Sequence, residues 1–172
     1  MSQLGALNLH SWIETNRHLL KPPVGNQVIW NSNFMVMVVG GPNQRTDFHV
    51  NPGEELFYQV EGDIVLRVME NGKARDIPIR QGDLFLLPAG IPHSPQRPAN
   101  TVGLVVEQPK MVSGNHHLRW YCPTCNAIVH DAEFAPADFS RQLKAMIEKF
   151  NSSTELRTCK SCRTVYQAPA QS

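Results

Sequence analysis

The sequence has few cysteines, little net charge and no long apolar segment. Only four of its 172 residues are cysteine, and all four lie in two Cys-x-x-Cys pairs near the C-terminus. Sixteen basic residues nearly balance fifteen acidic ones, which leaves a formal net charge of +1. No apolar run approaches the roughly 18–20 residues that a membrane-spanning helix needs.

These absences exclude several classes of protein. Balanced charge argues against a surface built for nucleic acid or for an anionic membrane. Short apolar runs argue against a membrane protein, and the first residues lack the basic start and apolar core of a signal peptide. We therefore expect a cytoplasmic protein, in which paired cysteines bind metal rather than form disulfides.

Prolines and glycines are frequent, and the apolar segments between them are short. The 13 prolines and 11 glycines supply many turn signals, among them Asn71-Gly72, which is typical of a two-residue β-hairpin turn. Short strands joined by tight turns from about residue 28 to 107 predict a mainly β fold, a small barrel or jelly roll.

Two segments outside that region carry helical periodicity. Apolar groups in residues 7–20 are spaced for a short amphipathic helix. An apolar stripe in residues 139–150 predicts a second helix that packs against the rest of the chain. Between the barrel and this helix, residues 111–119 are expected to be a polar linker. The chain is thus divided into a barrel domain, 1–109, and a C-terminal extension, 110–172.

The segment 82–97 contains the first candidate metal ligand. Its run Leu84–Leu87 is too short for a helix and is interpreted as a buried strand. Pro88 and Pro92 then form a stiff turn that ends at His93. A rigid turn gives a histidine the fixed orientation that a metal ligand needs, although a lone histidine in a loop more often has no such role.

An earlier segment supplies a histidine and an acidic residue. His49 is followed by Glu55, and six residues separate Glu55 from Gly62. Glu54 is the competing ligand, and Glu55 is preferred because it keeps the spacing to Gly62. Two imidazoles and one carboxylate on one face of a metal leave the opposite face open, as in non-haem Fe(II) oxygenases.

Both segments resemble the sequence motifs of the cupin superfamily. The second motif extends from Gly82 through His93 to Arg97 and matches at every fixed position but the last, where Asn is usual. In the first motif Asp47 takes the place of the first of two histidines. The resemblance implies a cupin fold, a double-stranded β-helix or jelly-roll barrel, but that fold hosts enzymes, storage proteins and sensors alike.

Longer strings narrow the resemblance to one family. PPVGN at 22–26, GGPNQRTDFHVNPGEELFYQVEG at 40–62, LLPAGIPHSPQRP at 86–98 and VVEQ at 105–108 closely resemble 3-hydroxyanthranilate 3,4-dioxygenases, and the C-terminal cysteine pairs resemble those of bacterial members. Phe48 stands where many members have Tyr.

The resemblance implies an oxidoreductase that opens the ring of 3-hydroxyanthranilate with O2. The product, 2-amino-3-carboxymuconate semialdehyde, cyclises to quinolinate, the NAD precursor. The sequence leaves open whether the reaction serves tryptophan catabolism by the kynurenine pathway, NAD biosynthesis or nitroaromatic degradation. The family also suggests a homodimer, with no nucleic-acid or membrane partner.

The resemblance assigns roles to residues near the metal. His49, Glu55 and His93 would hold Fe(II). Arg97 would pair with the substrate carboxylate, a bidentate contact that suits guanidinium. Arg45, which strand alternation places on the same face as His49, would lie near the substrate hydroxyl and O2. From the residues alone, either arginine could equally be a surface residue.

Three further residues receive substrate roles from the resemblance. Glu107 would accept a hydrogen bond from the substrate amino group and manage protons. Val24 and Asn26 would belong to a loop that closes over the bound ring. Without the family, Glu107 would be interpreted as a solvated charge at the end of a strand.

The two cysteine pairs predict a second metal site. Cys122, Cys125, Cys159 and Cys162 would give a closed tetrahedral set of thiolates that suits iron or zinc. A closed set has no open position for substrate, so the site is expected to be structural. In the related bacterial enzymes it resembles a rubredoxin centre. A zinc ribbon that binds DNA is the alternative, against which the lack of a basic patch counts.

Two other functions stay open. One is a related ring-cleaving dioxygenase for another ortho-substituted aromatic acid, which only a substrate comparison separates from the first. The other is a non-catalytic, metal-binding cupin regulator whose cysteine ribbon meets nucleic acid or a partner. Arg45 and Arg97 beside the metal ligands, together with balanced charge, favour an enzyme for a small anionic substrate.

Overall fold

The computed structural model describes residues 5–21, 25–43, 45–108, 113–135 and 139–168, without the side chains of 139–141. The helices are α1 (Leu9–Asn16), α2 (Phe139–Ser152) and α3 (Thr154–Arg157), with a 3-10 turn at Arg17–Leu19. The strands are β1 (Asn26–Asn31), β2 (Met35–Gly40), β3 (Phe48–Val50), β4 (Glu55–Glu61), β5 (Ile64–Glu70), β6 (Lys73–Ile79), β7 (Leu84–Leu87), β8 (His93–Gln96), β9 (Val102–Glu107), β10 (His116–Tyr121) and β11 (Ile128–Phe134). Within these ranges, no helix is both long and apolar enough to span a membrane.

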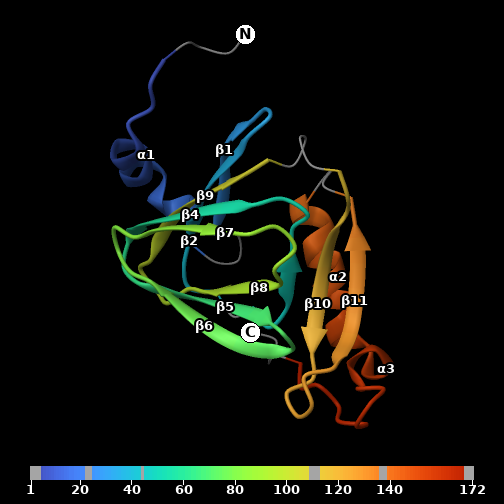
Figure 1. Ribbon diagram of the computed structural model, residues 1–172. Helices are drawn as coiled ribbons and strands as arrows, with labels where there is room; N and C mark the ends of the chain where they lie inside the picture. The colour runs from blue at the N-terminus through green and yellow to red at the C-terminus, as the bar shows by residue number, and fades with distance from the viewer. Residues whose placement is uncertain (1–4, 22–24, 44, 109–112, 136–138, 169–172) are drawn as a thin grey trace.

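The strands form two antiparallel sheets that face each other (Figure 1). One has the order β1-β2-β9-β4-β7 and the other β11-β10-β3-β8-β5-β6. From β4 to β9 the chain passes back and forth between the sheets, which closes a jelly-roll barrel and confirms the predicted mainly β cupin fold. Asn71 and Gly72 have positive φ angles of 51° and 73° at the predicted hairpin turn between β5 and β6.

Alternation along the strands gives the barrel its core. On β4, Glu55, Phe57 and Gln59 are buried, whereas Leu56 and Tyr58 between them are half-buried. The inner apolar cluster consists of Met37, Phe57, Ile64, Leu66, Val68, Ile79, Leu87 and Val105. Burying an apolar side chain of this size contributes about 1.5–3 kcal/mol. Polar Glu55 and Gln59 share this inner face, so they need partners there.

The N-terminal helix is present but shorter than the predicted span 7–20. Asn8 caps α1, because its Oδ1 accepts a hydrogen bond of 2.9 Å from the Ser11 N–H. The helix therefore starts at Leu9, and after Asn16 the chain tightens into the 3-10 turn. Ile13 is fully buried and belongs to a cluster with Val38, Val60 and Val102 of the first sheet.

Leu84–Leu87 forms the predicted strand, β7, but the interpretation of that strand as buried is wrong. β7 is the edge strand of its sheet, and only one of its faces is covered. Leu87 is 2% exposed, but Leu84 and Leu86 are 65% and 52% exposed. A short apolar run has no periodicity that could reveal that one side faces solvent.

The expected polar linker at residues 111–119 is also wrong from His116 onward. β10 begins there and pairs with β3, where Leu118 lies opposite His49. His116, Leu118 and Trp120 point inward, while His117 and Arg119 alternate with them on the other face. This alternation, in a segment rich in polar residues, is the signal that the linker interpretation missed.

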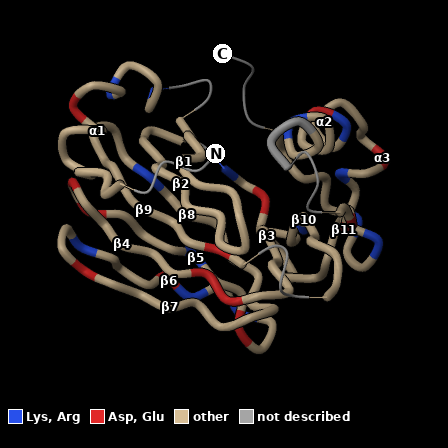
Figure 2. Tube along the Cα trace, turned by 90° about the horizontal axis from the view of Figure 1, so that it is seen from above, with Lys and Arg blue, Asp and Glu red and all other residues tan. Residues whose placement is uncertain are grey.

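The helix predicted from the stripe in residues 139–150 is confirmed. Leu143, Met146, Ile147 and Phe150 of α2 pack with residues of β10 and β11, whereas the Phe139 side chain lies outside the description. The Trp120 and Phe150 rings stack with centroids 4.2 Å apart. Seen from above in Figure 2, α2 and α3 group with β10 and β11 at one end of the molecule.

Candidate active site

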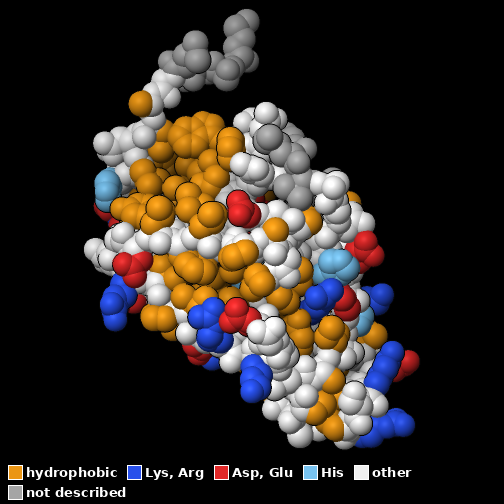
Figure 3. Space-filling view, in the orientation of Figure 1, with side chains coloured by type: hydrophobic (Ala, Val, Ile, Leu, Met, Phe, Trp, Pro, Cys, Tyr) orange, Lys and Arg blue, Asp and Glu red, His pale blue; other side chains and the backbone are white. Residues whose placement is uncertain are grey.

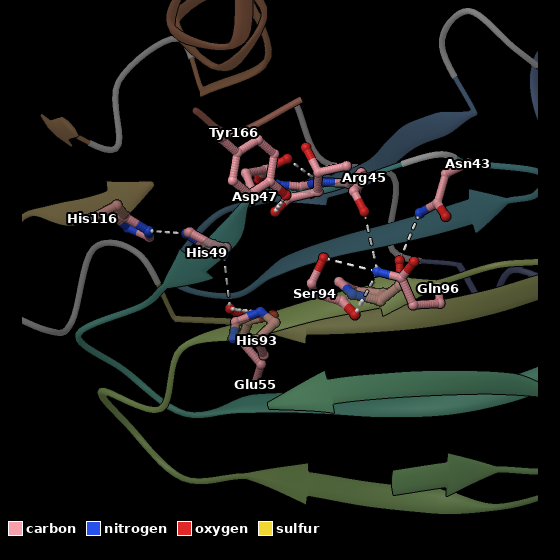
Figure 4. A network of polar contacts seen from close by, with 12 residues as sticks. Asn43, Arg45, Asp47, His49, Glu55, His93, Ser94, Gln96, His116 and Tyr166 are labelled. Carbon is pink, nitrogen blue, oxygen red and sulfur yellow. Dashed lines mark hydrogen bonds and ion pairs between the residues drawn. The ribbon is translucent and has the colours of Figure 1, made fainter. Parts of the chain in front are cut away.

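Three of the predicted metal ligands meet inside the barrel (Figure 4). His49 of β3 and His93 of β8 are register partners, and Glu55 begins β4. Glu55 Oε1 lies 3.3 Å from His49 Nδ1 and 3.3 Å from His93 Nε2. All three residues are at most 4% exposed, whereas the competing Glu54 is exposed.

The arrangement of these three side chains fits one metal ion. Two ligand atoms bound at about 2.1 Å and at right angles lie about 3 Å apart, close to the observed separations. Two imidazoles and one carboxylate also form the donor set of non-haem Fe(II) sites. Because three side chains converge among the described residues, other coordination positions would stay open to substrate and O2.

His93 is oriented by the predicted proline turn. Its Nδ1 lies 3.0 Å from the Ile91 carbonyl oxygen. A carbonyl only accepts, so Nδ1 carries a hydrogen and Nε2 is the nitrogen that remains to bind a metal. The turn is tied to the neighbouring loop, because the Gly90 N–H donates to the Asn51 carbonyl at 2.8 Å.

His49 is held by a residue that the sequence interpretation did not identify. Its Nε2 lies 2.8 Å from Nδ1 of His116, which comes from β10. Burial, together with the neighbouring His49, lowers the pKa of His116 to about 4. At neutral pH the His116 ring is therefore uncharged, with one nitrogen able to accept a hydrogen bond.

The charge states of His49, Glu55 and His93 favour the binding of a cation. Burial lowers the pKa of His49. Burial alone would raise the pKa of Glu55, but the charge of His93 and the hydrogen bonds of both histidines outweigh it and hold that pKa well below the usual range. Glu55 is thus a carboxylate at neutral pH, which suits a divalent ion.

Asn51 joins Glu55 to Glu107, the acidic residue predicted at the end of β9. Its Nδ2 donates to Glu55 Oε1 at 3.0 Å and to Glu107 Oε2 at 3.1 Å. Burial and the charge of Glu55 raise the pKa of Glu107 to about 9. Glu107 is therefore protonated at neutral pH. In the sequence, Asn51 is recognisable only as part of a turn, Asn51-Pro52-Gly53. Its contact with Glu107 depends on the pairing of distant strands.

Arg97 is a buried cation. It is 4% exposed, and its Nη1 donates to Gln59 Oε1 at 3.4 Å. No ion pair joins it to a carboxylate within the part of the chain that the structure describes. Burial and the charge of Arg45 lower its pKa to about 10, so it stays charged at neutral pH. A Cβ on Gly103 would lie 2.9 Å from Nη1, so this glycine leaves space for the guanidinium.

Arg45 is paired with Asp47. Arg45 Nε lies 3.3 Å from Asp47 Oδ1, and Nη2 contacts Oδ2. Burial alone would lower the pKa of Arg45, but the Asp47 charge outweighs it and raises that pKa. The prediction that one strand carries both Arg45 and His49 is wrong, because β3 begins only at Phe48. Asp47 stands at the position of the missing motif histidine. It forms an ion pair with Arg45 and is not part of the candidate ligand group.

The prediction that Asn26 lies in a loop is wrong, because Asn26 begins strand β1, where it is half-buried. Its Nδ2 lies 3.5 Å from Met37 Sδ. Its Oδ1 is buried and has no hydrogen-bond partner among the described residues. A buried oxygen without a donor is costly, and a bound ligand would relieve that cost. Val24, the other predicted loop residue, lies outside the described residues.

The inner face of the barrel places these groups in layers. Along β4 and β9, Glu55 faces Glu107, Phe57 faces Val105, and Gln59 faces Gly103. The Phe57 and His93 rings contact edge to face, with centroids 6.1 Å apart. The order is therefore a metal-binding layer, an apolar layer and a layer that contains the Arg97 guanidinium.

The four cysteines also come together. Sγ of Cys122 lies 3.5 Å from Sγ of Cys162, and Sγ of Cys125 lies 3.6 Å from Sγ of Cys159. Thiolates bound to one zinc ion at 2.3 Å would lie about 3.8 Å apart, so the set fits a tetrahedral metal. Contacts with the side chain and backbone of Thr164 lower the pKa of Cys162 to about 6, which favours the thiolate.

Matching backbone turns build the two cysteine pairs. The Cys122 N–H donates to the Ala127 carbonyl at 2.8 Å, and the Cys159 N–H donates to the Thr164 carbonyl at 2.9 Å. The residue after each second cysteine, Asn126 or Arg163, has a positive φ, 58° or 65°. Both turns therefore present their thiols with the same local geometry, as metal knuckles do.

Comparison with known proteins identifies the family. Residues 1–151 match the family model described as 3-hydroxyanthranilic acid dioxygenase. A protein named 3-hydroxyanthranilate 3,4-dioxygenase from Xanthomonas euvesicatoria is 49% identical over 95% of this chain and 93% of its own. Another of that name, from Neurospora crassa, is 49% identical over 91% of this chain and 87% of its own. A cupin-2 domain protein from Shewanella frigidimarina covers 60% of this chain and 94% of its own, with a TM-score of 0.49 and 15% identity. By the family model and these sequence relatives, the chain belongs to the 3-hydroxyanthranilic acid dioxygenase family.

Proposed function

We propose that this chain is a non-haem Fe(II) dioxygenase that opens the ring of 3-hydroxyanthranilate with O2 and gives 2-amino-3-carboxymuconate semialdehyde. The observation that carries the proposal is the buried Arg97, a cation without a carboxylate partner among the described residues, in the same barrel as the ligand group. Relatives named for this activity support the substrate.

The layers of the barrel match the parts of this substrate. His49, Glu55 and His93 would hold Fe(II), and the substrate hydroxyl and amino groups would face its open side. When bound, the iron supplies the electron transfer that lets O2 react with an aromatic ring. Phe57 and Val105 offer apolar surface to the ring, and Arg97 pairs with the carboxylate.

Other side chains orient the substrate and handle its proton. Glu107 accepts a hydrogen bond from the amino group, and its raised pKa suits a residue that exchanges protons near neutral pH. The Asn26 oxygen receives a donor from the bound molecule. Arg45, held by Asp47, lies near the hydroxyl group and O2. Val24 is proposed as a further substrate-binding residue.

Reconstitution tests the proposal directly. The protein is loaded with Fe(II) without air, mixed with 3-hydroxyanthranilate and then exposed to O2. We expect O2 uptake with the absorbance of the semialdehyde, and a much higher KM for 2-aminophenol, which lacks the carboxylate. Substrate binding without O2 uptake would favour the non-catalytic regulator, and faster turnover of a catechol acid would favour the related dioxygenase.

The four-cysteine site is proposed to hold a second iron or a zinc ion with a structural role. It would stabilise the C-terminal extension, 110–172, beside the catalytic domain, 1–109. Four thiolates leave no position for substrate. Reduced cysteines suit the cytoplasm, which is the compartment that we propose for the enzyme.

An apolar row on the outside of the first sheet supports a homodimer. Trp30, Val36, Val106, Leu56 and Leu86 follow one another across the five strands by register. Trp30 is 48% and Leu86 is 52% exposed. In Figure 3, hydrophobic side chains gather near β1 and again near β7, the two edges of this sheet. Such a surface is typical of a protein–protein contact.

A charge placed in this row tests the homodimer. Leu86→Glu should give a monomer by analytical ultracentrifugation, because a carboxylate would be buried in the contact. Lys73→Glu, on the exposed strand β6, serves as the control and should stay dimeric. An unmodified protein that sediments as a monomer would contradict this part of the proposal.

A further inference from the structure

We infer that His116 is a positioning residue of the catalytic metal site, which the C-terminal part of the chain supplies to the barrel. It accepts a hydrogen bond from Nε2 of His49 and thereby keeps the Nδ1 lone pair of His49 directed at the metal. The inference rests on the proposed function, because it takes His49 to be a ligand.

The two histidine ligands have equivalent supports. His93 turns Nε2 toward Glu55 and gives its Nδ1 hydrogen to the Ile91 carbonyl. His49 turns Nδ1 toward Glu55, so its Nε2 needs a partner of the same kind, and Nδ1 of His116 lies 2.8 Å away. Metal-binding histidines almost always hydrogen-bond through the second ring nitrogen, which fixes the tautomer and the ring plane.

Packing fixes the acceptor in place. The His49 and His116 rings are nearly parallel, at 5°, with centroids 5.1 Å apart. Phe134 of β11 packs against both, at 5.4 Å from His116 and 6.2 Å from His49. His116 is 2% exposed. Pairing of β10 with β3 places His116 next to His49. Strands β10 and β11 therefore form one side of the metal site.

The next residue provides a matched control. His117 lies on the opposite face of β10, with 28% of its side chain exposed, and its Nδ1 lies 2.9 Å from Asp131 Oδ1. It has the same chemistry and the same strand as His116 but no contact with His49 in the structure. A substitution there reports any general effect on β10.

Three variants separate hydrogen bonding from packing. His116→Phe keeps an aromatic ring but removes the acceptor, His116→Asn keeps an acceptor close to the position of Nδ1, and His117→Phe is the control. Fe(II) affinity is measured anaerobically against a chelator, with the four-cysteine site already filled with Zn(II). We expect His116→Phe to bind Fe(II) 10–100-fold more weakly, the range typical for loss of an outer partner. His116→Asn and His117→Phe should stay close to the unmodified protein.

Two spectroscopic readouts complete the test. The EPR signal of the nitric oxide adduct of bound Fe(II) should change in His116→Phe and return in His116→Asn. In unmodified protein loaded with Zn(II), long-range proton–nitrogen NMR should show His49 with its hydrogen on Nε2. This second readout needs no variant, so a His49 hydrogen on Nδ1 would overturn the inference even if His116→Phe does not fold.

The outcomes separate this inference from the proposed function. Unchanged Fe(II) affinity and EPR signal in a folded His116→Phe protein would overturn it, as would a His49 hydrogen on Nδ1. A His116→Asn protein as impaired as His116→Phe would also overturn it, since packing would then explain the loss. Unmodified protein that binds Fe(II) but does not consume O2 would instead contradict the proposed function.

Discussion

The two candidate metal-binding groups of this chain differ in how the protein surrounds them. The barrel group is buried, and each histidine has a partner on its second nitrogen. A buried arginine that has no carboxylate partner among the described residues lies on the same inner face. The cysteine group has two exposed members, Cys125 and Cys162, and rests on two matching backbone turns.

This difference agrees with the roles proposed for the two groups, a reactive site in the barrel and a structural site at the cysteines. Three ligands on one side leave open coordination positions, whereas four thiolates fill a tetrahedron. Glu107, with a pKa raised to about 9, lies beside the barrel group. A buried acid with a raised pKa and a buried cation without a carboxylate partner among the described residues are signs of chemistry, and both lie near the barrel group.

Loss of a barrel ligand should have the largest effect. His49→Ala or His93→Ala should abolish Fe(II) binding in the barrel and all O2 uptake, since two remaining ligands do not hold the ion. Metal analysis should still find the cysteine-bound ion, which serves as the internal control. Full activity in either variant would remove that histidine from the site.

Removal of the buried guanidinium should have the second-largest effect on activity. Arg97→Ala should raise the KM for 3-hydroxyanthranilate by roughly 10–100-fold, because a charge-assisted hydrogen bond contributes about 1.5–3 kcal/mol. Steady-state O2 uptake measures it. Arg75→Ala is the control, since that exposed arginine pairs with Glu70 on the outer surface. An equal KM in both variants would contradict the role of Arg97.

Damage to the cysteine group should affect folding rather than chemistry. Cys159→Ser should lower the stability by several kcal/mol, since binding of a structural metal contributes directly to folding, and the melting temperature should fall. Turnover per folded, iron-loaded molecule should persist. If a well-folded variant lost turnover selectively, the cysteine site would have a redox role.

A smaller, pH-dependent effect is expected for Glu107. Its folded pKa of about 9 lies above the unfolded value near 4.5, so the folded, metal-free protein binds a proton that the unfolded chain has lost. Stability should therefore decline as pH rises from about 4.5 to 9. Glu107→Gln should lack this decline and gain on the order of 1–3 kcal/mol at pH 8 relative to unmodified protein. Urea unfolding at several pH values measures it, and parallel curves would contradict the raised pKa.

The features that could be predicted from the sequence are those that depend on residues close together in the chain. The barrel, the hairpin at Asn71-Gly72 and the set His49, Glu55 and His93 all followed from local motifs or from family resemblance, and the structure brings those three side chains together. Burial then favours Glu55 over Glu54.

What the sequence did not reveal depends on pairing between distant strands. His116 contacts His49 across 67 positions of the chain, and Asn51 contacts Glu107 across 56, and neither spacing is a motif. Asp47 was noticed as a departure from the motif, but its pairing with Arg45 needed the structure. One face of β7 is exposed because β7 lies at the edge of its sheet, and the order of strands in a sheet is likewise set by distant pairing.

One measurement tests most directly the claim that ring opening takes place in the barrel and not at the cysteines. The four-cysteine site is filled with redox-inert Zn(II) and the barrel with Fe(II), and O2 uptake with 3-hydroxyanthranilate is measured per barrel iron. The account predicts the same turnover as in protein with iron at both sites. Loss of turnover with zinc in the cysteine site, while the barrel iron is retained, would contradict it.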